Sequence, residues 1–377
     1  MPESTAVLHR ESVSSRAYRA ASVLCALLSA GCATTGISWK GAAVAPRVDV
    51  FYATDRDVEL PDGEQGSSPA SQAWANPFAG DRGAGPLSFG RVPVRLPMHG
   101  HLGRIPAANG RGPCGLDSAC LARPVSQGED LFAQSLRDAL ARSASNDVLV
   151  FVHGYNFRFD EAVLWAAQLK HDVQFAGVVV LYSWPSRGSR WAYGADLANA
   201  EWTSPHLARF LDRLASLVGD GRVHLLAHSM GSKAAVYALH ALAVERRTTP
   251  PPRLGQVILA AADLDAGVFG QLIPPVLAIA DRVTLYTAAD FALRISGWLF
   301  AHARAGDSYG PPVLLDGVDT VDVTSVDGGS AGHNYFLEDE RVLADICQLL
   351  AHGAPPQRRF RLFGVQLQGL TVWQFRF

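Results

Sequence analysis

The chain of 377 residues has almost no net charge and no long apolar run. It carries 33 lysines and arginines against 35 aspartates and glutamates, a formal net charge of −2 at pH 7. Because no basic block precedes the extreme C-terminus, the sequence argues against a nucleic-acid partner. No apolar run reaches the roughly 20 residues of a membrane-spanning helix. With 48% hydrophobic residues, the composition predicts a globular protein with one large core.

Cysteine is also scarce, with five in the chain. Cys114 and Cys120 lie close together, but neither a second cysteine pair nor a nearby histidine pair supplies the remaining ligands of a zinc site. The sequence therefore predicts no metal, and nothing in it implies an organic cofactor. In an oxidising compartment, we expect Cys114 and Cys120 to form a short-loop disulfide.

The first 32 residues are typical of an export signal. Arginines at 10, 16 and 19 precede an apolar run from Ala20 to Ala30, and Gly31 and Cys32 follow. Residues 28–32 resemble a bacterial lipobox, in which the cysteine is lipidated and becomes the new N-terminus, although Ser29 stands where leucine is usual. We expect an exported lipoprotein, anchored to a membrane on its periplasmic or cell-surface side, with residues 33–47 as a tether. Ordinary signal cleavage and a retained signal anchor are the alternatives.

Strands and helices alternate along the rest of the chain, which is typical of an α/β fold with a mostly parallel sheet. We expect an α/β domain over residues 48–353, with irregular insertions near 57–87 and 97–127 and a strand-like extension over 354–377. One helix is expected to start at Pro205. The extension alternates aromatic and other residues, and we favour its docking on the domain over contact with a membrane. The predicted strands cover residues 48–54, 88–96, 148–152, 177–183, 223–228, 256–261, 282–287 and 318–324.

The most informative stretch runs from Val223 to Gly231. An apolar strand ends in His-Ser-Met-Gly, and a helix rich in small residues begins at once. This is the strand–turn–helix context of a nucleophile elbow, in which a tight turn presents a serine hydroxyl above the sheet. Small residues must flank that serine because strand and helix pass close together. Ser229 is therefore the predicted nucleophile, and the alternative is an ordinary loop serine.

A serine hydroxyl needs a base to take its proton at neutral pH. The chain supplies Ser229, then an aspartate, then His333, which is the order of the triad in α/β hydrolases. Two aspartates compete for the role of orienting the histidine. We favour Asp290, which follows the second strand after the elbow, over Asp263, which follows the first.

Acyl transfer also needs backbone N–H groups that stabilise an oxyanion. One is expected from Met230, directly after the nucleophile, and the other from Tyr155 in the loop His153-Gly154-Tyr155. Glycine in that loop lets the backbone turn its amide toward a substrate. Trp184, Trp191 and Tyr193 follow the next strand, where they either line a substrate pocket or serve as packing. Trp184 and Tyr155 are our candidates for substrate binding.

The segments VFYATDR, VFVHGYN, YSWPSRG, LLAHSMG, YTAAD and GHNYF resemble a bacterial α/β-hydrolase family of esterase/lipase-like proteins with uncharacterised function. The resemblance extends from Val48 to Ala351. It implies the α/β-hydrolase fold, with a mostly parallel central sheet and helices on both faces, and it implies a serine hydrolase. Ala227 stands where the elbow usually has its first glycine.

Together these residues predict hydrolysis of a small-molecule or lipid carboxylic ester through an acyl-enzyme on Ser229. The same groups can serve a thioesterase, an amidase or an acyltransferase. A rival of another class is a surface lipoprotein that binds a partner without catalysis, since the fold also occurs in proteins that are not enzymes.

Overall fold

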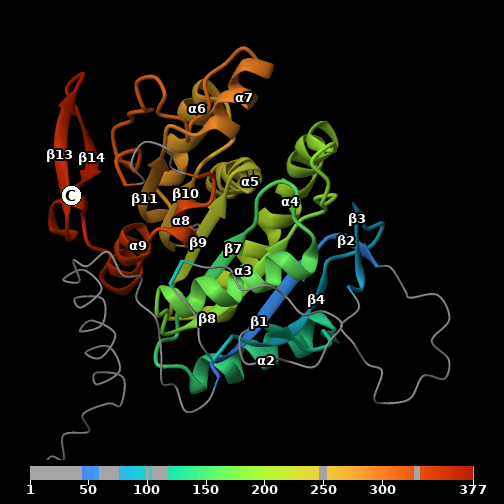
Figure 1. Cartoon of the computed structure of the whole chain (residues 1–377). Coiled ribbons are helices and arrows are strands. Elements are labelled where there is room, and N and C mark those ends of the chain that lie inside the picture. Colours follow the sequence, from blue (N-terminus) through green and yellow to red (C-terminus); the bar gives the residue numbers. More distant parts are fainter. Residues whose placement is uncertain are drawn as a thin grey trace, which may run out of the picture.

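The computed structural model describes residues 45–58, 76–98, 102–103, 118–245, 253–326 and 332–376. Its main feature is a twelve-stranded sheet with strand order β13-β14-β12-β11-β10-β9-β7-β8-β1-β4-β5, in which β6 also pairs with β4 (Figure 1). The strands are β1 (Arg47–Thr54), β4 (Ser88–Arg95), β5 (Cys120–Leu121), β6 (Val125–Gln127), β7 (Val148–Val152), β8 (Val178–Ser183), β9 (Val223–His228), β10 (Leu254–Ala260), β11 (Ala280–Thr287), β12 (Val318–Asp322), β13 (Leu362–Leu367) and β14 (Leu370–Phe375).

The neighbouring strands β1-β8-β7-β9-β10-β11-β12 run parallel. Antiparallel pairs, β1 with β4 and β13 with β14, lie toward the two ends of the sheet. All residues of β7, β8, β9 and β10 are buried. This explains why these strands are mostly apolar, because a parallel strand covered by helices on both faces has no solvent side. The carboxyl ends of these strands meet at one edge of the sheet, where α/β folds place their functional loops.

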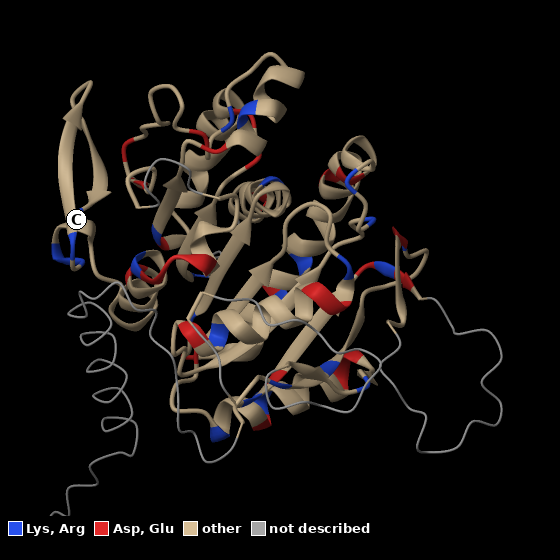
Figure 2. Ribbon diagram, viewed as in Figure 1, with Lys and Arg blue, Asp and Glu red and all other residues tan. Residues whose placement is uncertain are grey.

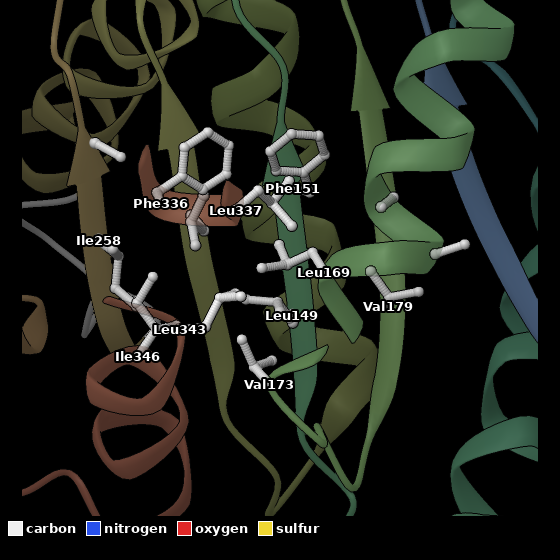
Figure 3. Close-up of a cluster of buried hydrophobic side chains, with 14 of the residues drawn as sticks. Leu149, Phe151, Leu169, Val173, Val179, Ile258, Phe336, Leu337, Leu343 and Ile346 are labelled. Atoms are coloured by element: carbon white, nitrogen blue, oxygen red, sulfur yellow. The ribbon is translucent and has the colours of Figure 1, made fainter. Parts of the chain in front are cut away.

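Helices cover both faces of the sheet. One face packs against α3 (Phe159–Asp172), α8 (Tyr335–Glu338) and α9 (Glu340–His352), and Figure 3 shows Leu149 and Phe151 of the sheet among side chains of these helices. The other face packs against α2 (Glu129–Arg142), α4 (Tyr193–Val218), α5 (Met230–Glu245) and α6 (Ala266–Leu277). The predicted fold class, a mostly parallel sheet between two helical layers, is confirmed.

The helix expected to begin at Pro205 is longer than predicted. It is α4, which begins at Tyr193 and contains Pro205 in its interior. A proline there removes one backbone hydrogen bond at a cost of about 3 kcal/mol. Buried residues in the preceding turns, among them Ala200 and Thr203, offset that cost by packing into the core. The prediction was wrong because proline marks a helix start only when tertiary packing does not extend the helix beyond it.

Three α-helices of the described chain escaped prediction: the one-turn helix α8, and the longer α6 and α7 (Phe291–Leu299). The two longer helices begin after Asp265 and Asp290 respectively. Each aspartate accepts hydrogen bonds from backbone N–H groups of the first turn, so each is a helix N-cap. In α6 the pair Pro274 and Pro275 hid the helical pattern.

The C-terminal extension forms the hairpin β13–β14, preceded by the short helix η2 (Pro356–Arg358). Strand β14 pairs in parallel with β12, with Val321 opposite Trp373, so the hairpin extends the central sheet. The prediction that this segment docks on the domain is confirmed. Figure 1 shows the hairpin at one end of the sheet.

The predicted insertions contain short ordered pieces. Strands β2 (Arg56–Val58) and β3 (Phe78–Arg82) form a separate two-stranded sheet, while β5 and β6 join the central one. Cys32 and the export signal lie outside the described residues, and so does Cys114. Within the described part of the chain, no helix is long and apolar enough to cross a membrane.

Candidate active site

Ser229 sits on a strained turn between β9 and α5. Its φ of 52° lies in the left-handed region, which side chains other than glycine rarely adopt. Its backbone N–H donates to the carbonyl of Ala260 over 2.9 Å, which fixes the turn against β10. A Cβ on Gly231 would lie 2.2 Å from the carbonyl oxygen of His153, so only glycine lets helix and loop approach this closely. The turn has the geometry predicted for an elbow.

His333 lies against this serine. The distance from His333 Nε2 to Ser229 Oγ is 2.8 Å, and that from His333 Nδ1 to Asp290 Oδ2 is 2.5 Å. An ionised carboxylate only accepts hydrogen bonds, so Nδ1–H donates to Asp290 and Nε2 is left to accept from the Ser229 hydroxyl. The three side chains therefore form one hydrogen-bonded chain from acid to nucleophile.

Three hydrogen bonds hold the segment that carries His333. The ring nitrogen Nε2 of His228 donates to the carbonyl of His333 over 3.0 Å. The hydroxyl of Tyr335 donates to the carbonyl of Tyr286 and accepts from the N–H of Ala261, at 2.8 and 2.7 Å. These bonds tie the segment to the ends of β9, β10 and β11, so His333 is positioned from the backbone as well as by Asp290.

His228 is neutral for a physical reason. Burial, as the largest cause, lowers its pKa well below the usual value. Its ring stacks on Trp165 at a centroid distance of 5.9 Å and lies 4.6 Å from the ring of Phe336. Its Nδ1 has no hydrogen-bond partner in the described part of the chain. The neutral ring thus fills an aromatic site while it supports the backbone of His333.

Asp290 is buried, and both of its carboxylate oxygens are used. Oδ2 faces His333, while Oδ1 accepts from the N–H groups of Ala292 and Leu293 at 2.8 and 3.3 Å. The second set of bonds is the N-cap of α7. Because the cap fixes the carboxylate at the helix start, the oxygen facing the histidine has a defined direction.

Asp263 faces a different set of partners. Its carboxylate accepts from the hydroxyls of Tyr193 and Ser296 at 2.6 and 2.7 Å and lies 3.1 Å from Nε of Arg304. Arg304 is itself buried, so this is a desolvated ion pair. Burial and the neighbouring Asp263 raise the pKa of Tyr193. The carboxylate that competed for the acid role is thus bound to an arginine rather than to His333.

The loop after β7 lies beside the nucleophile, as expected of an oxyanion loop. An added Cβ on Gly154 would lie 2.8 Å from Nδ1 of His228 and 3.0 Å from Cβ of Ser229. Glycine is therefore needed for the loop to reach the serine. Met230 is the first residue of α5, where backbone N–H groups have no acceptor within the helix. The amides of Met230 and Tyr155 thus belong to segments that flank Ser229.

A buried arginine supports that loop. Nη2 of Arg56 donates to Nε2 of His153 over 3.3 Å and to the carbonyl of Phe157 over 2.9 Å. Because a guanidinium can only donate, Nδ1 of His153 carries the proton and donates to the carbonyl of Gly154. Burial lowers the pKa of Arg56 to about 10, with Asp55 and Asp196 opposing the shift. The same burial, with the charge of Arg56, lowers the pKa of His153 well below its usual value.

Trp184 does not line a pocket. It is 0% exposed, stacks on His153 at a ring distance of 5.2 Å, and donates from Nε1 to the carbonyl of His153 over 2.7 Å. The expectation that it binds substrate was wrong, because its buried indole packs against His153 and bonds to the backbone of the loop after β7. Tyr155 is partly exposed, and its ring lies 5.3 Å from that of Tyr193.

Three supporting residues were not identified from the sequence, namely Arg56, His228 and Tyr335. Each lies in a segment that carried the family resemblance: VFYATDR, LLAHSMG and GHNYF. The sequence did offer a signal for each: Arg56 follows a buried strand, and His228 and Tyr335 lie within two residues of a predicted catalytic residue. Their partners come from distant parts of the chain, so spacing did not reveal their roles.

Two further expectations concern the cysteines and metal ions. Cys120 takes part in a disulfide, but Cys114 lies outside the described residues, so their pairing stays a prediction. In the described ranges, no three side chains of histidine, cysteine, aspartate or glutamate are grouped as metal ligands would be.

Comparison with solved structures gives distant similarities. A putative hydrolase from Agrobacterium vitis S4 is 13% identical, with a TM-score of 0.35, over 72% of this chain and 96% of that one. ESTFA in its Fe-lacking apo form is 10% identical, with a TM-score of 0.32, over 90% and 92%. The peroxisomal α/β-hydrolase Lpx1 of Saccharomyces cerevisiae is 10% identical, with a TM-score of 0.31, over 87% and 95%.

No curated protein matches the chain. A family model does: the α/β hydrolases of unknown function, DUF900, match residues 129–352, which is more than half of the chain and includes Ser229, Asp290 and His333. Together with the fold, this match shows that the chain belongs to that family of α/β hydrolases.

Proposed function

We propose that the protein is a serine hydrolase that cleaves a carboxylic ester through an acyl-enzyme on Ser229. The observation that carries the proposal is the continuous hydrogen-bond chain from Asp290 through His333 to Ser229 Oγ, on a turn with positive φ. In this scheme, His333 takes the hydroxyl proton as Oγ attacks the ester carbonyl. It then gives that proton to the leaving alcohol, and Asp290 stabilises the imidazolium.

The oxyanion of each tetrahedral intermediate is assigned to the amides of Met230 and Tyr155. The support for this assignment is the position of Gly154 against Ser229 and of Met230 at the start of α5. Water then enters, His333 acts again as base, and the acid product leaves. No step requires a metal or an organic cofactor.

The test is labelling with a fluorophosphonate probe, followed by hydrolysis of p-nitrophenyl esters of graded chain length. We expect Ser229→Ala and His333→Ala to lower kcat on the order of 10³-fold or more, since the residues of a triad act as a unit. The probe should label wild type but not Ser229→Ala. Ser232→Ala is the matched control. Ser232 lies three residues after Ser229 in the first turn of α5, and its hydroxyl donates to the carbonyl of Ala227.

Near-wild-type turnover in Ser229→Ala, or labelling of that variant to the wild-type extent, would refute the mechanism. Loss of labelling in Ser232→Ala would show that the assay reports the integrity of α5 rather than the nucleophile. Adding matched thioesters and amides to the panel distinguishes the hydrolyses that share these groups, because a thioester or amide hydrolysed faster than every ester would reassign the substrate class.

A further inference from the structure

The helix that begins at the candidate acid carries an apolar face exposed to solvent. Phe291, Ile295, Trp298 and Leu299 of α7 are 68%, 50%, 84% and 59% exposed. Their spacing of i, i+4, i+7 and i+8 places them on one side of the helix. Single exposed apolar residues are common, but a contiguous set of this size marks an interaction site. Leu293 and Ser296 are the residues of α7 that are buried.

Aromatic rings connect this face to the reaction centre. Phe300, directly after α7, lies 5.9 Å from the ring of Tyr193, which lies 5.3 Å from that of Tyr155 in the oxyanion loop. Trp191, two residues before Tyr193, is 87% exposed. We call Phe291, Ile295, Trp298, Leu299 and Phe300 the α7 surface. Figure 1 shows α7 beyond the carboxyl ends of the parallel strands, where Ser229 lies.

The α7 surface is held rigidly. Ser296 of α7 and Tyr193 at the start of α4 both bind the carboxylate of Asp263, and Nε of Arg304 donates to Ser296 Oγ over 2.7 Å. The start of α7 is fixed by Asp290, which also faces His333. An occupant of this surface would therefore lie in a defined position relative to Ser229.

Charge indicates which occupant the α7 surface suits. Between Phe291 and Gly306 the chain carries Arg294 and Arg304 but no aspartate or glutamate, while Asp290 and Asp307 stand at the two ends of this stretch, and α7 shows blue in Figure 2. Arg294 and Arg190 are exposed and lie over the rings of Tyr309 and Trp191, at 4.4 and 5.7 Å. A tryptophan and an arginine on an apolar helix face, as Trp298 and Arg294 are on α7, are typical of segments that lie in the headgroup region of a lipid surface.

We propose that the α7 surface docks on a lipid bilayer that carries anionic headgroups and so presents a lipid ester to Ser229. The docking rests on the α7 surface itself, and its use in catalysis rests on the proposed function. The apolar side chains enter the acyl region, while Arg294 and Arg190 contact the headgroups. Each arginine near such a surface contributes about fivefold in affinity, so added salt should weaken binding.

The test measures binding without turnover. Full-length protein carrying Ser229→Ala and Cys32→Ser, which removes the predicted lipid attachment, is sedimented with vesicles of equal parts phosphatidylcholine and phosphatidylglycerol. We expect Trp298→Ser combined with Leu299→Ser to weaken binding about tenfold or more, since two large apolar groups no longer leave water. The matched control is Leu131→Ser on α2, where Leu131 is 58% exposed, and it should bind as the parent does.

A second measurement locates the contact. Vesicles with brominated acyl chains quench tryptophans that enter the bilayer, so they should quench the emission of the parent protein. Trp298→Phe, which keeps the apolar character, should lose a large part of that quenching, whereas Trp373→Phe on β14 should not. Pure phosphatidylcholine vesicles should bind more weakly than the anionic ones.

Unchanged binding in the Trp298→Ser/Leu299→Ser variant, or an equal loss in Leu131→Ser, would overturn the docking proposal. So would a concentration-dependent dimer that this variant abolishes in the absence of vesicle binding, because the occupant would then be a second copy of the chain. Labelling of Ser229 by the fluorophosphonate probe is independent of these results. Failure of the docking and failure of the proposed hydrolysis are therefore distinguishable.

Discussion

Asp263 and Asp290 follow neighbouring parallel strands at the same edge of the sheet, and both are buried. Their carboxylates nevertheless have opposite surroundings. Asp290 binds His333 and the first turn of α7, whereas Asp263 binds Arg304, Ser296 and Tyr193. The difference shows that equivalent positions at strand ends do not have equivalent roles: the partner brought in by the next loop decides. One carboxylate is available to orient a base, and the other holds α7 in place.

The largest expected effect tests this contrast in the reaction rate. Asp290→Asn should lower kcat roughly 10²–10⁴-fold, because an amide at this position favours the wrong tautomer of His333. Asp263→Asn should lower kcat far less, since its carboxylate does not contact the histidine. Steady-state hydrolysis of a soluble p-nitrophenyl ester by the two variants makes the comparison. The reverse ranking would transfer the acid role to Asp263.

The second prediction concerns the free energy of unfolding, for which we expect the Asp263 variant to lose more than the Asp290 variant. Asp263→Ala leaves Arg304 buried without its counter-ion, and we expect the free energy of unfolding to fall by about 3–5 kcal/mol. Asp290→Ala removes a helix cap, for which a loss of about 1–2 kcal/mol is typical. Urea denaturation of both variants measures the difference. Replacing the pair together, as Asp263→Leu with Arg304→Met, should restore most of the loss, and a double variant as unstable as Asp263→Ala would contradict the ion-pair explanation.

The smallest expected effect is in the pH dependence of stability, and it compares the two histidines beside Ser229. His333 faces a carboxylate, whereas His228 is buried with its pKa lowered well below the usual value. Below about pH 6.5 the unfolded chain binds a proton at this residue that the folded protein does not. Stability due to His228 is thus present above that pH and falls by about 1.4 kcal/mol per pH unit below it.

His228→Phe keeps an aromatic ring in this site but cannot bind a proton. We therefore expect its free energy of unfolding to decline less steeply with acid than that of wild type, as measured by urea denaturation across the acidic range. His153, whose pKa is also lowered by burial, gives a second variant for the same comparison. An unchanged slope in His228→Phe would show that this histidine is protonated in the folded protein.

Local patterns alone placed much of the molecule. The buried strands β7, β8 and β9 were predicted within a residue or two, because a strand covered on both faces is mostly apolar. The elbow at Ser229 was identified because a tight strand–helix turn accepts only small neighbours, and Gly231 meets that need. The lipidation of Cys32 remains a prediction from the same kind of local pattern.

The sequence by itself determined the α/β alternation and the chain order of Ser229, the competing aspartates and His333, since these depend on periodicity and position along the chain. Tertiary structure decided which aspartate faces His333, because Arg304 and Ser296 reach Asp263 from another segment. It also decided that Trp184 is buried against His153 and that α7 keeps an exposed apolar face. The physical reason is that side-chain partners and burial depend on segments distant in sequence, and no local pattern encodes them.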